Sequence, residues 1–167
     1  TNKVYGTSLA PVDYTVSGLL NEDSVTNVTL SSSGSVSNAA VGSYAIIASN
    51  PLGTGLTNYT IGYGNGTLTV NAASLLITAT DTNKVYGTSL TFAGTEFIAT
   101  GLLNIDTITS VSLTSAGALA DAVAGTYAIV ATNANGTGLS NYAISYVNGT
   151  LTVTNSDTLF LITSIVP

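Results

Sequence analysis

The sequence predicts an all-β protein made of two tandem homologous β-sandwich modules, either immunoglobulin-like or β-grasp-like. The segment Thr-Asn-Lys-Val-Tyr-Gly-Thr-Ser-Leu occurs at residues 1–9 and again, unchanged, at residues 82–90. Within each copy, β-branched and aromatic residues alternate with polar ones between Gly and Asn residues, which is typical of half-buried strands. No window of eleven or more residues shows a clear helical period of 3.6.

The repeat extends through the whole of each copy. A two-residue insertion near Thr91 changes its spacing, and from there matched residues lie 83 positions apart, as Gly18 and Gly101 do. Self-similarity over about eighty residues indicates two copies of one folding unit. We predict module 1 at residues 1–73, module 2 at residues 74–156 and an extra C-terminal strand at residues 157–167.

The clearest local prediction is a hairpin at the end of each module. In module 2, two alternating segments, 142–146 and 150–153, flank Asn148 and Gly149. Asn-Gly accepts the positive φ that tight hairpin turns require. Residues 59–70 repeat this pattern in module 1, so we expect the same hairpin there.

Four motifs recur in both copies. They are Lys-Val-Tyr-Gly, Gly-Leu-Leu-Asn-x-Asp, Gly-(Ser/Thr)-Tyr-Ala-Ile and the closing Asn-Tyr-x-Ile-x-Tyr-x-Asn-Gly-Thr-Leu-Thr-Val. Together they resemble the MBG/YDG repeats of large bacterial surface adhesins over nearly the whole chain. The resemblance implies extracellular stalk or adhesive modules, often in long arrays, and it supplies no catalytic residues.

The two modules do not open alike. Module 2 begins with an apolar segment, Leu75–Thr80, that precedes its copy of the repeated motif, whereas module 1 begins at the motif itself. Beyond Val153 a similar segment follows, in which residues 160–163 align with residues 75–78. A sheet that lacks one strand exposes apolar side chains and unpaired backbone groups. We therefore expect an open groove in module 1.

The spare C-terminal segment predicts head-to-tail assembly of an extracellular filament. Residues 158–166 of one subunit would complete module 1 of the next copy. The interface side chains of this donor strand are Leu159, Phe160, Leu161, Ile162, Ile165 and Val166. Alternatively, the chain is a stalk or ligand-binding segment of a longer adhesin array, cut one strand out of phase. Closure within one chain is a third interpretation, for which the linker 154–157 is short.

Composition excludes several classes of partner. Charged residues make up 6% of the 167 residues, the net charge is −6, and Lys3 and Lys84 are the only cations, so we expect no nucleic acid partner. Apolar stretches are far shorter than the roughly 18 residues of a membrane helix, so we expect no membrane insertion. The absence of Cys and a start at Thr1 fit a secreted, extracellular or cell-surface protein whose signal has been removed.

We expect no enzymatic activity, cofactor or metal. The sequence has no His, so its hydroxyl groups lack the usual catalytic base. Only one acid of the adjacent pair Glu22 and Asp23 recurs in module 2, and the density of acids typical of calcium loops is absent. A Ser and Lys dyad is formally available, but we expect Lys3 and Lys84 on exposed strand ends or turns.

Five Asn-x-Ser/Thr sequons occur in the chain. They begin at Asn27, Asn58, Asn65, Asn135 and Asn148. Such sequons are acceptors for N-linked glycosylation on the surface of secreted proteins. Surface glycans, of a host or of a matrix, are a further class of partner if the modules bind a ligand.

Overall fold

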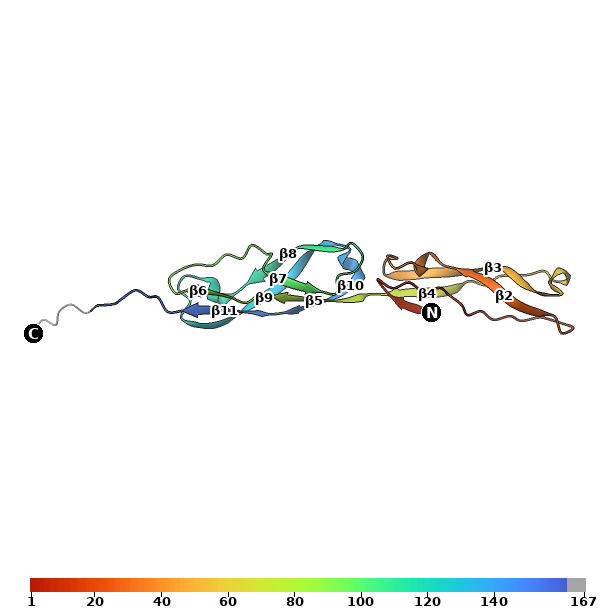
Figure 1. The fold of residues 1–167 in the computed structure, drawn as a ribbon, viewed down its shortest axis with the longest axis horizontal. Coiled ribbons are helices and arrows are strands. Elements are labelled where there is room, and N and C mark those ends of the chain that lie inside the picture. The colour runs from red at the N-terminus through yellow and green to blue at the C-terminus, as the bar shows by residue number, and fades with distance from the viewer. Residues whose placement is uncertain (162–167) are drawn as a thin grey trace, which may run out of the picture. The chain divides into compact units, whose positions relative to one another are not determined.

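The computed structural model describes residues 1–161 (Figure 1). These residues form two compact units, one built around Thr1–Ser74 and the other around residues from Leu75 onwards. Within the described residues there are eleven strands and four short 3-10 turns but no α-helix. The prediction of an all-β chain with two tandem homologous modules is confirmed.

Module 1 contains one four-stranded sheet, in the order β1-β4-β3-β2. The first and last strands, β1 and β4, pair in parallel, and the other neighbours are antiparallel. The strands are β1 (Asn2–Val4), β2 (Ser24–Ser31), β3 (Gly42–Thr54) and β4 (Gly66–Asn71).

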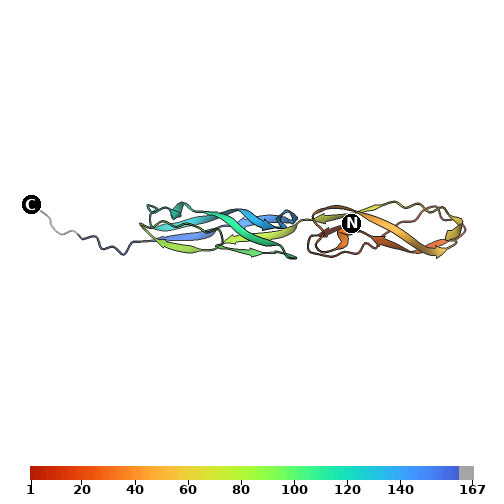
Figure 2. The ribbon, with the colours of Figure 1, turned by 90° about the horizontal axis from the view of Figure 1, so that it is seen from above.

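Module 2 contains the same four-stranded sheet and a second one. The order β6-β11-β9-β8 repeats that of module 1, and the three-stranded sheet β10-β5-β7 has no counterpart within residues 1–72, all of which the structure describes. Strands run along the length of their module (Figure 2). They are β5 (Ala73–Ala79), β6 (Thr82–Val85), β7 (Phe97–Thr100), β8 (Thr107–Thr114), β9 (Gly125–Thr137), β10 (Tyr142–Val147) and β11 (Gly149–Thr154).

The central strand β5 shows the period of two that a half-buried strand requires. Its alternate residues Ala73, Leu75, Ile77 and Ala79 are buried, and Leu76 between them is exposed. Successive side chains of a strand point to opposite faces of its sheet, so β5 turns one whole face toward the core. From Leu75 onwards this strand therefore supplies three buried side chains to module 2: Leu75, Ile77 and Ala79.

The predicted Asn-Gly hairpins are wrong. β10 and β11 flank Asn148, but they belong to different sheets, and neither Asn148 nor Gly149 has a positive φ. The chain crosses from one sheet to the other at this point. Gly149 is needed for another reason, because a Cβ there would lie 2.6 Å from the carbonyl oxygen of Ala79. In module 1 the corresponding Gly66 also lacks a positive φ.

The two lysines are buried, contrary to the expectation of exposed strand ends or turns. Lys3 and Lys84 retain only 6% and 7% of their accessible surface. The Nζ of Lys84 donates hydrogen bonds to the carbonyl oxygens of Thr88 (2.8 Å) and Leu119 (2.5 Å), and Lys3 makes the matching two bonds in module 1. Burial lowers the pKa of Lys3. Each ammonium thus ties two loops to the first strand of the four-stranded sheet.

A tyrosine and an aspartate form a second matched contact. The hydroxyl of Tyr142 donates to Oδ2 of Asp106, and that of Tyr59 donates to Oδ2 of Asp23, both over 2.8 Å. The Tyr142 oxygen also accepts a hydrogen bond from the amide of Leu103 (2.8 Å). Burial, with the neighbouring Asp106 carboxylate adding to it, raises the pKa of Tyr142 to about 12.

Replacing Lys84 with Met should destabilise module 2. The substitution leaves the carbonyls of Thr88 and Leu119 without their donor, which costs about 1–3 kcal/mol of unfolding free energy. Urea unfolding followed by circular dichroism measures the change, and Asn83→Met, on the exposed face of the same strand, serves as the matched control. A Lys84→Met chain as stable as the parent would show that the ammonium contributes nothing.

The raised pKa of Tyr142 predicts a loss of stability at alkaline pH. Because the folded pKa lies above the ordinary value of about 10, the stabilisation is complete below pH 10 and is lost as the pH rises toward 12. Between pH 9 and pH 11.5, we expect the free energy of unfolding of Tyr142→Phe to fall by about 2 kcal/mol less than that of the parent chain. Urea unfolding at the two pH values measures both changes. Equal losses in the two chains would contradict this account.

Candidate functional site

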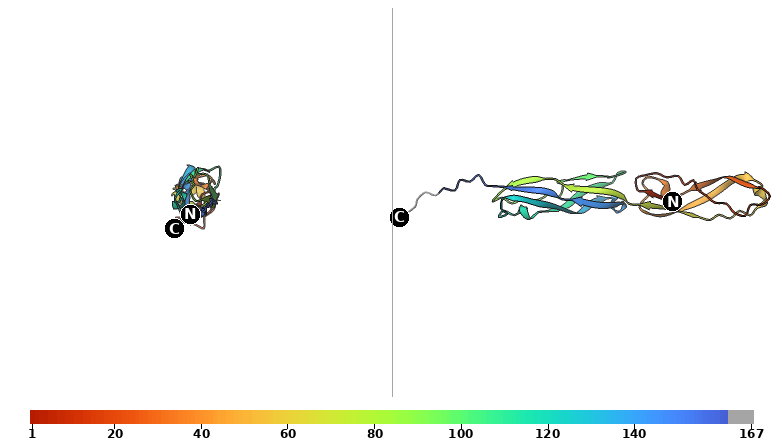
Figure 3. Two further views of the ribbon diagram at one scale, coloured as in Figure 1. Left: turned by 90° about the vertical axis from the view of Figure 1, so that its left-hand side faces the viewer. Right: turned by 90° about the horizontal axis from the view of Figure 1, so that it is seen from below.

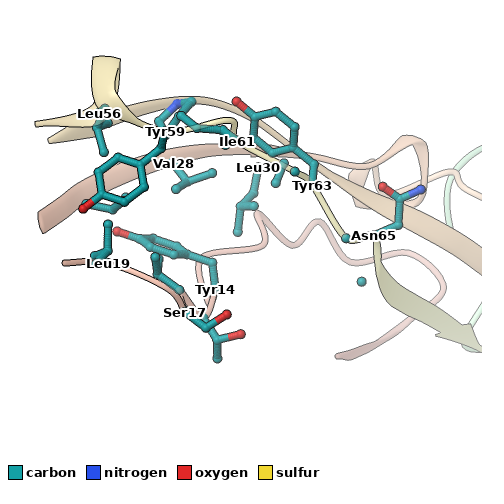
Figure 4. A pocket seen from close by; sticks show the side chains of 18 of the residues that line it. Tyr14, Ser17, Leu19, Val28, Leu30, Leu56, Tyr59, Ile61, Tyr63 and Asn65 are labelled. Atoms are coloured by element: carbon teal, nitrogen blue, oxygen red, sulfur yellow. The ribbon is translucent and has the colours of Figure 1, made fainter.

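Module 1 carries an open groove of about 670 Å³. Residues 13–17 form one wall and residues 59–66 the other. Four apolar side chains of β2 and β3, which we call the floor residues, lie between the walls: Val28, Leu30, Ile46 and Ala48. Figure 4 shows Tyr14 on one side of this space and Ile61 and Tyr63 on the other. The groove is therefore a candidate site of module 1.

The two walls correspond to two strands of module 2. At the repeat spacing of 83 positions, residues 14–17 match β7 and residues 59–64 match β10. In module 2 these two strands lie on either side of β5. In module 1, residues 14–17 and 59–64 do not form strands, and the ribbon draws them as thin traces (Figure 3). The groove is therefore the place that β5 occupies in module 2.

The floor residues differ in burial from their counterparts. In module 1 all four are half-buried. The counterparts in module 2 are all buried: Val111, Leu113, Ile129 and Ala131. Both modules share the sheet that carries these positions, so the second sheet of module 2, with β5 at its centre, accounts for the difference. The predicted exposure of apolar side chains in module 1 is thus present in the structure.

The walls carry free backbone groups and little charge. Within the described residues, residues 14–17 and 60–65 make no backbone hydrogen bond to other backbone groups. Asp13 is the one charged residue of the lining. At one end of the groove, Tyr59 is held by Asp23 and by the amide of Leu20, 2.8 Å from its hydroxyl oxygen. An uncharged extended backbone with apolar side chains matches this combination of surfaces.

The predicted donor residues are placed only in part. Leu159, Phe160 and Leu161 keep 82%, 87% and 68% of their surface and belong to no strand. None of the three is among the residues that line the groove. The other predicted donor residues, Ile162, Ile165 and Val166, lie outside the described residues.

The five predicted glycosylation sites are all exposed. Asn27 lies in β2, Asn135 in β9, and Asn148 between β10 and β11, while Asn58 ends a 3-10 turn. Asn65 lines the groove, so a sugar there would stand beside it. Glycosylation stays a prediction at each of them.

The sequence predicted an open groove in module 1, but it did not predict which residues form the two walls of that groove. Tyr14, Val16, Ile61 and Tyr63 are exposed apolar side chains that we did not single out from the sequence. Their pairwise alternation and their spacing of 83 from β7 and β10 were the available signals. Finding them required knowledge of which strands flank β5, and strand order is not contained in periodicity.

Among residues 1–161, no group of three or more acidic side chains is placed to hold a metal ion. In the same part of the chain, no helix has the length and apolar character needed to cross a membrane.

Comparison with known proteins identifies the family. The family model described as MBG domain (YGX type) matches residues 1–69 and 75–152. No curated protein and no solved structure was found to match the chain. The two matched segments cover most of the 167 residues and correspond to the two repeats. The chain therefore belongs to the MBG domain (YGX type) family and contains two of its modules in tandem.

Proposed function

We propose that the chain is a non-enzymatic, structural repeat segment of an extracellular, cell-surface protein of the adhesin type. The observation that carries this proposal is that both modules use their repeated residues to hold themselves together. The repeated Lys ties loops to a strand, and the repeated Tyr and Asp bond to each other. The repeated Lys, Tyr and Asp residues thus stabilise the fold of each module rather than bind a ligand.

A structural segment also suits the surface chemistry of the chain. Its exposed residues are dominated by Thr, Ser, Asn and Gly, and charged residues are only 6% of the sequence. Modules in arrays contact mainly their neighbours and can be added without new binding chemistry. The proposal therefore needs no cofactor, metal or active site.

The mechanical response of the full chain tests this role. When the chain is pulled from its two ends, we expect two separate unfolding steps, each releasing about 3.3–3.6 Å per residue. Module 1 should unfold at the lower force, because its floor residues are only half-buried. A chain that extends without resolved steps does not act as a load-bearing spacer, and this result would overturn the proposal.

A ligand-binding repeat is the other form of the same proposal. Exposed aromatic residues, such as Tyr63 and Tyr86, are suited to stacking on sugars. A screen of the full chain against immobilised glycans separates the two forms. We expect no saturable binding for a spacer, and saturable binding of one glycan class would assign a recognition role instead.

A filament subunit is a second candidate function, favoured by one specific observation. The groove of module 1 lacks a strand, while apolar residues 159–161 of the same chain are exposed. An extended segment that adds to a sheet gains main-chain hydrogen bonds and side-chain burial together. We propose that residues 158–166 of one copy fill the groove of the next, head to tail.

Electron microscopy and light scattering test the filament. We expect the intact chain to form filaments and a chain truncated after Asp157 to remain monomeric. The truncation keeps all eleven strands, so both chains should show the same circular dichroism. If the intact and the truncated chain are both monomeric, the filament proposal is excluded and the proposal of a surface repeat segment remains.

A further inference from the structure

We propose that N-linked glycans at Asn27 and Asn135 cover the free edges of the two four-stranded sheets, at β2 in module 1 and at β8 in module 2. Five sequons occur in the chain, and the fold distinguishes these two from the other three. The proposal concerns a modification of each module, and it is independent of both functions proposed above.

Each four-stranded sheet ends in a long strand without charge. β2 and β8 are the last strands of the orders β1-β4-β3-β2 and β6-β11-β9-β8, and each has eight residues. An edge strand presents unpaired backbone groups, and proteins protect such edges with Lys, with Pro or with a β-bulge. Of these three devices, β2 and β8 contain only the bulge. In β8 the amide of Val111 also donates to the carbonyl oxygen of Gly94 (2.9 Å).

The bulge lies at the same place in both modules. In module 1 the register of β2 and β3 shifts on either side of Asn27, which faces Leu52. In module 2 the register of β8 and β9 shifts on either side of Ser110, which faces Asn135. A threonine hydroxyl of the edge strand donates to the carbonyl oxygen of Leu52 and, in module 2, to that of Asn135, each over 3.1 Å. The two bulges are therefore built alike.

The sequons at the two bulges are not copies of each other. At the repeat spacing of 83 positions, Asn27 corresponds to Ser110. Asn135 corresponds to Leu52, so the two sequons begin on different strands of the bulge. Duplication of one module accounts for sequons at matched positions, but not for two that begin on different strands and lie at one place in the fold. Each module thus carries one acceptor at its bulge.

Both acceptors are accessible to a glycosyltransferase. Asn27 and Asn135 are exposed, and so are Thr29 and Thr137, which complete the two sequons. In the reaction, the side-chain nitrogen of the asparagine attacks the anomeric carbon of a glycosyl diphosphate donor. A C–N bond forms, the bond from that carbon to the diphosphate oxygen breaks, and the diphosphate leaves with the electron pair. The amide nitrogen gives up one proton.

A glycan at the bulge stands beside the edge strand in both modules. Asn27 belongs to the edge strand itself. Asn135 faces Ser110 of the edge strand, and opposite residues of antiparallel strands have Cβ atoms about 4.5–5.5 Å apart. A bulky, hydrated sugar at either position keeps another strand from approaching the edge. It therefore gives an uncharged edge the protection that a lysine gives elsewhere.

Mapping of the occupied sites tests the modification. The full chain is produced as a secreted protein in cells that N-glycosylate their exported proteins. Its sugars are released enzymatically in oxygen-18 water, which labels each asparagine that carried one, and the peptides are analysed by mass spectrometry. We expect label at both Asn27 and Asn135. A folded, secreted chain without label at either of them would overturn the proposal.

Removal of both acceptors tests the protection of the edges. We expect the chain with Asn27→Gln and Asn135→Gln to associate about tenfold faster than the glycosylated parent, as followed by light scattering, with the same circular dichroism. The matched control, Asn65→Gln with Asn148→Gln, removes the sequons that precede β4 and β11 and should associate like the parent. All chains keep residues 158–166, so assembly through that segment is common to them. Equal rates in all three chains would show that the glycans do not protect the edges.

A charge at the same place separates the loss of edge protection from a defect in folding. The chain with Asn27→Lys and Asn135→Lys has neither acceptor, but it carries a lysine at each bulge. Because lysine on or beside an edge strand prevents strand pairing, we expect its association rate to lie within about twofold of the glycosylated parent. If this chain associates as fast as the glutamine variant, covering of the edges is not what the glycans do, and the proposal fails.

Discussion

The fold depends most on the central position of β5, which has a strand on each side and the core beneath it. In module 2, its buried residues Leu75 and Ile77 face the core while β7 and β10 flank it. Where no such strand is present, residues 14–17 and 59–64 of module 1 do not become strands either. Backbone groups in a sheet need partners on the neighbouring strand, so the loss of one strand removes the ladder of two others.

Because the two modules are homologous, each residue of module 1 can be compared with the matching residue of module 2. Both modules share the four-stranded sheet, the buried Lys and the Tyr and Asp pair, and they differ in the second sheet. Half-burial of Val28 and Ile46 in module 1 can therefore be compared directly with the burial of Val111 and Ile129 in module 2. Apolar surface left in water is unfavourable, which gives module 1 a physical reason to accept a strand.

Sequence reasoning succeeded where the signal is local or repeated, and failed where it depends on distant partners. Alternation along β5 and the identity of residues 1–9 with 82–90 predicted strands and two homologous modules. Asn148 and Gly149 looked like a hairpin turn, but β11 pairs with β6 and β9 instead of β10. Lys84 is buried because a carbonyl 35 residues away accepts its hydrogen bond, and no local pattern announces such a contact.

Hydrogen exchange of the truncated chain tests the central claim most directly, because it compares matched segments of one molecule. Amides held in a sheet exchange slowly, and amides without partners exchange quickly. Residues 14–17 and 60–64 should exchange much faster than residues 97–100 and 143–147, their counterparts in β7 and β10. Equal protection of the two sets would mean that module 1 already has its second sheet and that no strand is missing.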